Sequence, residues 1–351
     1  MLTQFGNIIM KALLIQSQGE PVADQVVLGE VETPQPGPGE VLVRTEASAL
    51  NHLDLWVGRG LPGIDTPWPR IGGSDGCGRI ESLGSGVDPE WHGRRVILNA
   101  AIEQPASPHP DISEAGRDLR MIGEHSQGTH AEFFVAPADA LLDIGEFPAI
   151  TAAAAGLAHL TAWRMLRTRA RLQAGETVLI TGIGGGVALA CLNIAKHFGC
   201  RTIVTSRSEQ KLDQARTLGA DEGVLDQGED WSKAVRMLTA RRGVDVCADS
   251  IGAATHISCL KSLARAGRFV TCGCTTGPAP QTDLARIFWN QLEVLGSTMG
   301  NMQEFREVMS LILKGHFAPV IDLTLPCTEG AEAFRRIESG GQFGKVVIEW
   351  T

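Results

Sequence analysis

Glycines are clustered immediately after a short apolar segment in the middle of the chain. The segment Thr177–Ile180 leads into a run from Gly182 to Ala188 that reads Gly-Ile-Gly-Gly-Gly-Val-Ala. Glycine permits a tight turn and a close approach to a pyrophosphate, and the helix expected next would present free N–H groups and its positive dipole end. The pattern predicts a dinucleotide site, with a glycine-rich turn in another α/β protein as the alternative. The predicted phosphate-binding residues are Gly182, Gly184, Gly185, Gly186 and Val187.

The residues at the end of the next predicted strand indicate which dinucleotide is preferred. A site for NAD usually carries Asp or Glu there, which accepts a hydrogen bond from the ribose 2′-hydroxyl. This chain carries Ser206 and Arg207, with Lys211 one turn further on. A hydroxyl and a guanidinium suit the 2′-phosphate of NADPH, so we expect NADPH as the cofactor. The alternative is that Arg207 and Lys211 are simply solvated charges.

Composition and charge argue against several other functions. The net charge is −9 and no Lys/Arg-rich run is present, so we expect no nucleic-acid partner. No apolar run reaches the roughly 18 residues of a membrane span. The start lacks the features of a signal peptide, and Met10 resembles a second natural start after a short extension of residues 1–9. We therefore expect a cytoplasmic protein that acts on a small-molecule substrate.

Cysteine and tyrosine usage narrows the chemistry further. The chain has eight cysteines, and none of them forms a Cys-x2-Cys pair. Their apolar or glycine-rich surroundings predict buried, reduced thiols. The chain contains no tyrosine, which removes one common proton donor from any mechanism.

These residues must be positioned by two kinds of structure. The first 140 residues are β-rich, with strands predicted at 11–16, 40–47 and 94–98 between Gly and Pro clusters. The polar segment 103–128 is predicted to be a long surface loop. From about residue 145 the pattern changes to alternating strands and helices, which is typical of a parallel, doubly wound sheet. After an Ala-rich segment at 149–158, helices are predicted at 160–172, 186–197, 209–218, 231–241, 254–264, 302–313 and 330–338, and strands at 177–182, 202–206, 223–225, 244–249, 268–272, 292–295 and 345–349.

At this point the chain resembles the medium-chain dehydrogenase/reductase family over nearly its whole length from Met10. The matching segments are 36–44 (PGPGEVLVR), 47–54 (ASALNHLD), 73–78 (GSDGCG), 128–132 (GTHAE), the glycine loop 182–188 and 342–347 (QFGKVV). The resemblance implies an α/β protein with a GroES-like β-rich catalytic domain and a Rossmann domain with a doubly wound parallel sheet. We expect the GroES-like catalytic domain at residues 1–145 and 302–351 and the Rossmann domain at residues 146–301.

The resemblance also indicates whether zinc is used. Members with catalytic zinc carry Cys where this chain has Asn51 and His where it has Ser74, and their third ligand falls near Leu157, which cannot bind metal. Members with structural zinc carry four cysteines in a lobe where residues 99–138 of this chain have none. We therefore expect no metal. A site built from His52, His92 and His130 is the alternative, and surface or domain-edge hydrogen bonding is the more ordinary role of these histidines.

Without zinc, the chain resembles the quinone oxidoreductase branch, which carries the signature Asn51-His-Leu-Asp54. This implies hydride transfer from NADPH to a carbon–carbon double bond conjugated to a carbonyl, as in a quinone, an enone or an enoyl-type substrate. Such substrates are already electrophilic, so hydrogen-bond donors and a dry pocket can replace the polarising metal that a simple ketone needs.

The resemblance assigns roles to several further residues. The predicted catalytic residues are Asn51, Asp54 and Thr161, where Asn51 would bind the cofactor ribose or the substrate oxygen and Thr161 would contact the nicotinamide. Gly273 and Ser297 lie in loops expected to line the nicotinamide, and Trp56, Phe288 and Met299 are the predicted substrate pocket. Plain core packing is the alternative for these pocket residues. Asp54 and Asp75 have the alternative role of holding loops through side-chain-to-backbone bonds. The sequence leaves solvent, His52 and a cofactor hydroxyl as possible proton donors.

Two other functions remain open at this stage. One is an alcohol dehydrogenase that acts on alcohols and aldehydes with NAD or NADP. The other is an NADPH-binding sensor that has kept the fold and lost turnover, since fold alone does not prove activity. The resemblance further implies a homodimer joined along the edge of the Rossmann sheet, near residues 268–300.

Overall fold

The computed structural model describes residues 8–61, 63–64, 67–103 and 119–350. Most of the expected extension 1–9 and most of the expected loop 103–128 lie outside these residues. The chain divides into two compact units. Unit 1 comprises Met1–Leu157, Asn301–Met309 and Ile321–Thr351, and unit 2 comprises Ala158–Gly300 and Ser310–Val320. The first boundary thus falls inside helix α2 (Ala149–Trp163), later than the expected residue 145, and residues 310–320 belong to the second unit instead of the first.

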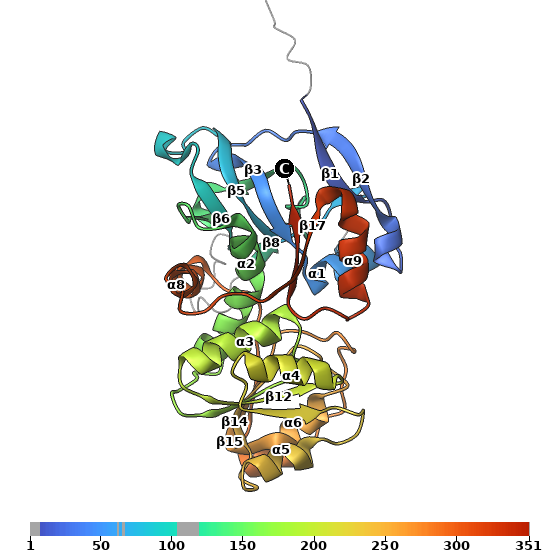
Figure 1. Cartoon of the computed structure of the whole chain (residues 1–351), viewed down its shortest axis with the longest axis vertical. Coiled ribbons are helices and arrows are strands. Elements are labelled where there is room, and N and C mark those ends of the chain that lie inside the picture. Colours follow the sequence, from blue (N-terminus) through green and yellow to red (C-terminus); the bar gives the residue numbers. More distant parts are fainter. Residues whose placement is uncertain (1–7, 62, 65–66, 104–118, 351) are drawn as a thin grey trace, which may run out of the picture. The chain divides into compact units, whose positions relative to one another are not determined.

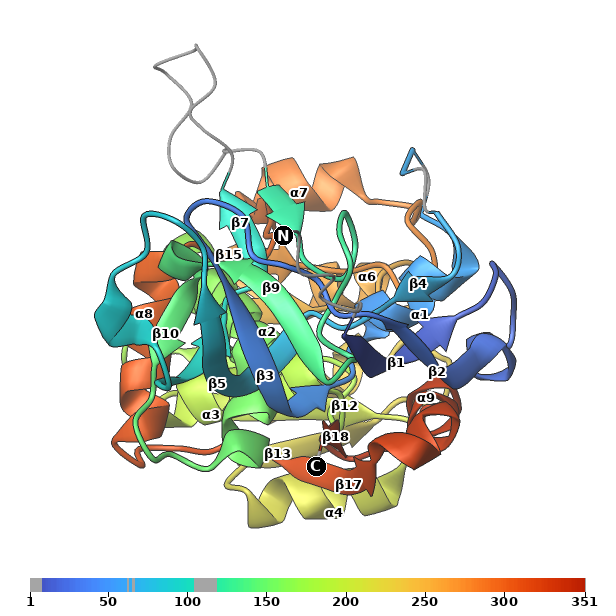
Figure 2. The ribbon, with the colours of Figure 1, turned by 90° about the horizontal axis from the view of Figure 1, so that it is seen from above.

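Unit 1 is built from β-sheets. The largest follows the order β10 (Leu141–Asp143), β6 (Arg95–Leu98), β5 (Asp75–Leu83), β3 (Glu40–Ala49), β18 (Lys345–Glu349) and β17 (Ile321–Pro326), and β9 (Phe133–Pro137) also pairs with β3. A second sheet has the order β2 (Val26–Glu32), β1 (Ile9–Ile15) and β4 (Arg70–Ile71), and β7 (Ala101–Glu103) pairs with β8 (Leu119–Met121). Figure 2 shows β3, β5 and β9 crossing this unit together.

The pairing of β18 with β3 joins segments that are far apart in the sequence. The two strands are antiparallel, with Val347 opposite Ala49 and Ile348 opposite Ser48. On its other edge β3 pairs with β5, where Ala49 lies opposite Asp75. The Leu50 N–H donates to the Val346 carbonyl at 2.9 Å and extends the pairing beyond the strand end. This register brings the start of β18 and the start of β5 to the residues that follow β3.

Helix α9 (Gly330–Glu338) closes the core on one side of unit 1. Its buried residues Ala333, Phe334 and Ile337 recur at helical spacing and pack in one apolar cluster with Leu13 of β1 and Ile348 of β18. The α9 N-terminus fits because it starts with a glycine: a Cβ at Gly330 would lie 2.3 Å from the Leu13 side chain.

Unit 2 holds a six-stranded parallel sheet with the order β13 (Glu222–Leu225), β12 (Arg201–Ser206), β11 (Thr177–Ile180), β14 (Val244–Asp249), β15 (Leu263–Thr271) and β16 (Glu293–Gly296). The chain first adds strands on one side of β11 and then on the other, so the direction of winding reverses between β11 and β14. Ligands of open α/β sheets bind at such a switch point, beyond the carboxyl ends of the strands.

Helices cover both faces of this sheet. In Figure 1, α3 (Gly186–His197) and α4 (Glu209–Thr217) lie on one face, and α5 (Ser232–Leu238) and α6 (His256–Ser262) lie on the other. Double coverage explains the continuous apolar runs of the central strands, which have no solvated side. Leu179, Ile203, Cys247 and Phe269 of four neighbouring strands share one buried cluster.

Several elements differ from those expected. The expected helix 160–172 is instead the end of α2 followed by a π-helical segment, Arg164–Arg169. The missed elements include α1 (His52–Arg59), which is only eight residues long, and strands β2, β5, β9 and β17. All eight cysteines are free thiols and five are buried, but Cys272 and Cys327 are half-buried and Cys274 is exposed, so the expectation of buried thiols is wrong at these three.

Replacement of Phe334 by alanine tests whether the returning C-terminal segment stabilises unit 1. Phe334 is 1 % exposed and meets the His130 ring edge-on, with ring centroids 6.1 Å apart. We expect Phe334→Ala to lower the free energy of unfolding by about 3–5 kcal/mol because it leaves a cavity. Urea unfolding followed by circular dichroism measures this. Met237→Ala, at a 74 % exposed position, is the control and should cost less than about 0.5 kcal/mol; equal effects would show that α9 does not stabilise the core.

Candidate functional site

Three polar side chains meet in unit 1 at the place that the strand register prescribes. The Lys345 ammonium donates to Asn51 Oδ1 at 2.5 Å and to Asp75 Oδ2 at 2.8 Å. Asn51 Nδ2 donates to the same Asp75 oxygen at 2.9 Å, which closes the triangle. Lys345 is 4 % exposed and Asp75 is 1 % exposed, whereas Asn51 is only half-buried. Lys345 was not among the predicted site residues.

The second oxygen of Asp75 is fixed by helix α2. Asp75 Oδ1 accepts from the Leu157 N–H at 2.6 Å. The carboxylate can approach this closely because residue 156 is glycine, where a Cβ would lie 2.3 Å from Oδ1. Both oxygens of Asp75 are therefore held, and neither is oriented toward a further ligand.

Asp54 fixes the backbone on which Asn51 stands. Its Oδ2 accepts from the Asn51 N–H at 2.7 Å and its Oδ1 accepts from the Gly73 N–H at 2.7 Å. The side chain is 1 % exposed and ties the start of α1 to the segment between β4 and β5. These contacts match the alternative role of a loop-holding carboxylate.

A buried chain of hydrogen bonds leads from β18 to Asp54. Trp350 Nε1 donates to Ser48 Oγ at 2.9 Å, and Ser48 Oγ lies 2.9 Å from His130 Nδ1. The other ring nitrogen of His130 faces Asp54 Oδ1 at 3.6 Å. A lone pair there would be repelled by the carboxylate, so we assign the proton to Nε2 and let the Ser48 hydroxyl donate to Nδ1.

Two groups of this region have shifted pKa values. Burial by itself raises the pKa of Asp54, but the facing His130 ring and the N–H groups of Asn51 and Gly73 outweigh burial and place the pKa below its ordinary value. Burial lowers the pKa of His52, and the positive charges of Arg59 and Lys345 lower it further. His52 is therefore neutral at pH 7 and is a poor source of a proton.

The positions matched to zinc ligands do not form a zinc site. Asn51 offers an amide that is already bonded to Lys345, Ser74 Oγ donates to the Ile122 carbonyl at 2.7 Å, and Leu157 has no donor atom in its side chain. A zinc ion needs thiolate, imidazole or carboxylate ligands, and the Lys345 ammonium would repel it. Within the described part of the chain, no three His, Cys, Asp or Glu side chains are grouped so as to hold a metal.

The glycine turn of unit 2 begins directly after β11. Gly182 has a φ of 64°, and a Cβ there would lie 2.6 Å from the Ile251 side chain, so only glycine fits. Gly185 is the N-cap of α3, and no side chain caps that helix end. Its first N–H groups and positive dipole end are thus available to a phosphate.

A buried carboxylate at the switch point, Asp249, holds this turn against its neighbour. Asp249 Oδ1 accepts from Thr181 Oγ1 at 2.6 Å and from Thr255 Oγ1 at 2.7 Å, and Oδ2 accepts from the Gly252 N–H at 2.9 Å. It therefore ties the end of β11 to the turn after β14. Sequence reasoning missed this residue, although an Asp that ends an apolar strand of a doubly wound sheet was a usable signal.

The end of β12 carries the residues expected to select the cofactor. Ser206 is buried and its Oγ accepts from the Ser208 N–H at 3.1 Å, whereas Arg207 is exposed. Ser208 caps α4 through the Lys211 N–H, so Lys211 lies in the first turn of that helix. Ser206, Arg207 and Lys211 thus share one strand end and one helix start, as expected.

The turn after β16 adds a polar group without a partner. Ser297 Oγ is buried and makes no hydrogen bond to the described residues. Two residues on, Met299 has a φ of 47° and its sulfur accepts from Thr161 Oγ1 at 3.7 Å. Ser297 therefore offers a buried hydroxyl at the carboxyl edge of the sheet that can donate to or accept from a polar group of a ligand.

The predicted site residues are only partly brought together. In unit 1, Asn51 and Asp54 are joined directly, and Trp56 is half-buried on the same helix, α1. In unit 2, Gly273 packs closely on the turn after β14, where a Cβ would lie 2.9 Å from the Ser250 carbonyl. Phe288 is 68 % exposed on α7 (Leu284–Asn290), so it is not packed in the core of its unit. The roles of all these residues stay predictions.

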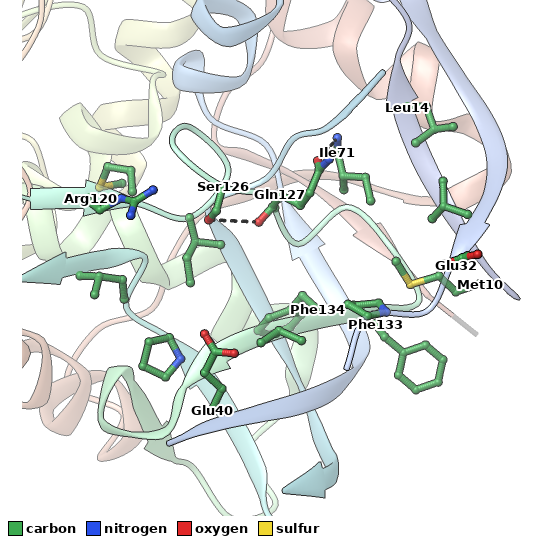
Figure 3. Close-up of a pocket in the computed structure, with 18 of the residues that line it drawn as sticks. Met10, Leu14, Glu32, Glu40, Ile71, Arg120, Ser126, Gln127, Phe133 and Phe134 are labelled. Carbon is green, nitrogen blue, oxygen red and sulfur yellow. Dashed lines mark hydrogen bonds between the residues drawn. The ribbon is translucent and has the colours of Figure 1, made fainter. Parts of the chain in front are cut away.

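Unit 1 also contains a hollow of about 460 Å³ away from the predicted residues (Figure 3). Its walls are mostly apolar and include Met10, Ile71 and Phe133, with Arg120 and Glu40 among the charged residues at its margin. Ser126 and Gln127 line it too, and Ser126 Oγ lies 3.5 Å from the Gln127 carbonyl oxygen. None of the predicted catalytic, cofactor or pocket residues lines this hollow.

Family models match both parts of the chain. Residues 37–146 match the alcohol dehydrogenase GroES-like domain, and residues 186–314 match the zinc-binding dehydrogenase model. No helix among the described residues has both the length and the apolar character needed to cross a membrane.

Similar proteins carry several names. A zinc-type alcohol dehydrogenase-like protein, YogA, of Leptosphaeria maculans is 32 % identical over 95 % of this chain and 97 % of its own length. A quinone oxidoreductase of Rattus norvegicus is 26 % identical over 98 % of each chain. Among solved structures, an NAD-dependent alcohol dehydrogenase has a TM-score of 0.88 with 34 % identity and covers 97 % of this chain and 100 % of its own. Another solved structure is that of a 2-octenoyl-CoA carboxylase reductase, CinF, in complex with NADP and 2-octenoyl-CoA. It has a TM-score of 0.87 with 26 % identity, and the match covers 97 % of this chain and 87 % of its own.

Replacement of Asp54 by asparagine should destabilise the protein in a pH-dependent way. The lowered pKa of Asp54 means that its carboxylate contributes stability above the unfolded pKa of about 3.9, and that this contribution is lost as the pH falls through the folded value. We expect Asp54→Asn to cost about 2–3 kcal/mol at pH 7 and clearly less below about pH 4. Urea unfolding at several pH values measures this. The exposed Asp139→Asn is the control, and a cost that does not change with pH would contradict the assignment.

Proposed function

The chain belongs to the medium-chain dehydrogenase/reductase superfamily of oxidoreductases, and we propose that it is a zinc-independent NADPH-dependent reductase of conjugated carbonyl compounds. Its substrate would be a quinone, an enone or an enoyl-type compound, and the double bond next to the carbonyl would accept the hydride. The observation that carries the proposal is the bond from the Lys345 ammonium to Asn51, at the position that holds a zinc ligand in other members.

This arrangement supports a substrate that needs little polarisation. A simple ketone needs strong polarisation of its oxygen, which a Lewis acid can supply, whereas the oxygen of a conjugated carbonyl takes up charge as the β-carbon accepts hydride. Hydrogen-bond donors directed at that oxygen are then sufficient. Asn51 is suited to this because one of its two N–H bonds points to Asp75 and the other has only a long contact of 3.5 Å with the Ala49 carbonyl.

The cofactor-binding residues of unit 2 support a nicotinamide dinucleotide. The uncapped start of α3 would bind the pyrophosphate, Ser206 and Arg207 would bind a 2′-phosphate, and Ser297 would donate to the nicotinamide end. NADPH supplies the hydride when bound. No Asp or Glu stands at residues 206–208, where a carboxylate would repel the 2′-phosphate.

The names of similar proteins support both this function and an alternative. A quinone oxidoreductase and an octenoyl-CoA reductase with NADP fit the proposal. NAD-dependent alcohol dehydrogenases are also similar over nearly the whole chain, so oxidation of alcohols with NAD is the second candidate. An NADPH-binding sensor without turnover is the third candidate function. The substrate assay below separates all three.

We further propose that the protein is a homodimer, and a cytoplasmic location stays a prediction. Strand β16 forms an edge of the sheet of unit 2, and exposed apolar side chains lie beside it at Phe288, Trp289 and Val294. Unpaired edges with exposed apolar groups are suited to association with another copy.

The substrate class is tested by NADPH oxidation with protein freed of metal by a chelator. The substrates are a naphthoquinone, a cyclic enone, an acrylate ester and a simple ketone. We expect turnover of the conjugated compounds, no gain from added zinc, and little turnover of the ketone. Activity confined to the ketone, or activity only after zinc is added, would favour the alcohol dehydrogenase instead. Binding of NADPH without turnover of any substrate would favour the NADPH-binding sensor.

The cofactor preference is tested by Arg207→Ala. Loss of one charged hydrogen bond to the 2′-phosphate is worth about 1.5–3 kcal/mol, so we expect the KM for NADPH to rise about 10- to 100-fold. The KM for NADH, which lacks that phosphate, should stay within about twofold. Arg216→Ala, at the far end of α4, is the matched control. Equal changes for both cofactors would mean that Arg207 does not contact the 2′-phosphate.

A further inference from the structure

We infer that Lys345 is a positioning residue that fixes the orientation of the Asn51 amide, and that it takes over the place of the metal as the local positive charge. This inference rests on the proposed function, because it deepens the role of Asn51 in binding the carbonyl oxygen. The inference can nevertheless be tested separately from the proposed function. It concerns which atoms of the Asn51 amide are bonded to the protein and which N–H stays available to a ligand.

The orientation follows from the donor and acceptor chemistry of the three groups. An ammonium can only donate, so the Asn51 atom at 2.5 Å from it must be the oxygen. An ionised carboxylate can only accept, so the Asn51 atom at 2.9 Å from Asp75 must be the nitrogen. Rotation of the amide by half a turn would place N–H against ammonium and oxygen against carboxylate. Both contacts would then be repulsive, so a single orientation survives.

The contact with Lys345 strengthens the remaining N–H of Asn51 as a donor. The positively charged Lys345 ammonium donates to the amide oxygen and so draws electron density away from the amide nitrogen, because hydrogen bonds in series polarise one another. Lys345 and Asp75 are both almost fully buried, so solvent does not screen the effect. Asn51 itself is half-buried and is the one member of the triangle that can reach a ligand.

Fixed geometry has a second consequence for the reaction. A donor that is already oriented needs no reorganisation when negative charge develops on the substrate oxygen. Neither Lys345 nor Asp75 needs to touch the substrate for this. The effect of Lys345 on the rate should therefore pass entirely through Asn51.

A double-mutant cycle tests this dependence. We expect Asn51→Ala to lower kcat about 100-fold, the usual loss for one oxyanion donor, with little change in the KM for NADPH. Lys345→Met should lower kcat about tenfold in the wild-type background and less than twofold in the Asn51→Ala background. Equal losses from Lys345→Met in both backgrounds would overturn the inference, because they would mean that Lys345 acts on the substrate directly or through the fold.

Two further variants separate positioning from folding. Lys345→Met leaves the Asp75 charge buried alone, which is itself destabilising. The pair Lys345→Met with Asp75→Asn removes both charges, so it should fold like the wild type and still lose kcat about tenfold. Arg336→Met is the control because Arg336 forms an ion pair with Asp322 in the same unit, at 2.7 Å, although this pair is more exposed than that of Lys345 with Asp75. It should leave kcat unchanged, and a full tenfold loss there would indicate a general effect of broken ion pairs.

Nuclear magnetic resonance measures the hydrogen exchange of the Asn51 side-chain amide in the absence of substrate. The chain has six asparagines, few enough for 15N-asparagine labelling to resolve their side-chain signals. The Asn51 pair is identified by its loss in Asn51→Ala. We expect the N–H proton that Asn51 donates to Asp75 to exchange slowly in the wild type and much faster in Lys345→Met with Asp75→Asn. Fast exchange in the wild type would refute the fixed amide even if the enzyme reduces enones, and slow exchange in a protein that reduces none would refute only the proposed function.

Discussion

The pairing of β18 with β3 determines the site in unit 1. Antiparallel register alone brings Lys345 opposite Asn51, and the pairing of β3 with β5 brings Asp75 to the same point. The Lys345–Asp75 ion pair is then buried with distances below 3 Å. Such a pair is stable only because its remaining hydrogen-bonding capacity is satisfied, here by Asn51 and by the backbone of α2. A shift of the β18–β3 register by one residue would turn the Lys345 side chain away from Asn51 and Asp75.

Around this triangle the protein uses polar groups mainly to hold backbone segments. Asp54 binds two N–H groups from different segments. In unit 2, Asp249 joins two segments by accepting from the Thr181 hydroxyl and from the Gly252 N–H. The buried line from Trp350 through Ser48 to His130 leads to the same Asp54. Few side chains are therefore free to contact a ligand, and buried polar groups bind the backbone beside them. Such support is what a site needs when its donors must not move during the reaction.

The sequence predicted the local structure around the candidate site better in unit 2 than in unit 1. The family and the fold class are confirmed by the comparisons. The glycine turn and α3 are local features, since spacing alone places glycines between a strand and a helix, and the expected bounds 186–197 are those of α3. Lys345 could not be found this way, because its partners lie 270 and 294 residues away and a lysine before an apolar strand normally suggests an exposed end. Helix α1 was missed because a short helix is stabilised by its tertiary contacts more than by its own propensity.

The same separation in sequence has a consequence for the order of folding. The strands β3 and β18 cannot pair until the whole of unit 2, which lies between them in the chain, has been synthesised. Unit 2 has its own core and mostly neighbouring strand connections, so it can fold while unit 1 still lacks two strands of its largest sheet. A compact unit 2 also brings the two ends of its segment closer than an unfolded chain would, which lowers the entropic cost of closing that sheet. During biosynthesis, a folded nucleotide-binding unit would therefore precede a competent catalytic unit, and the nascent protein would be able to bind its cofactor before it could use it.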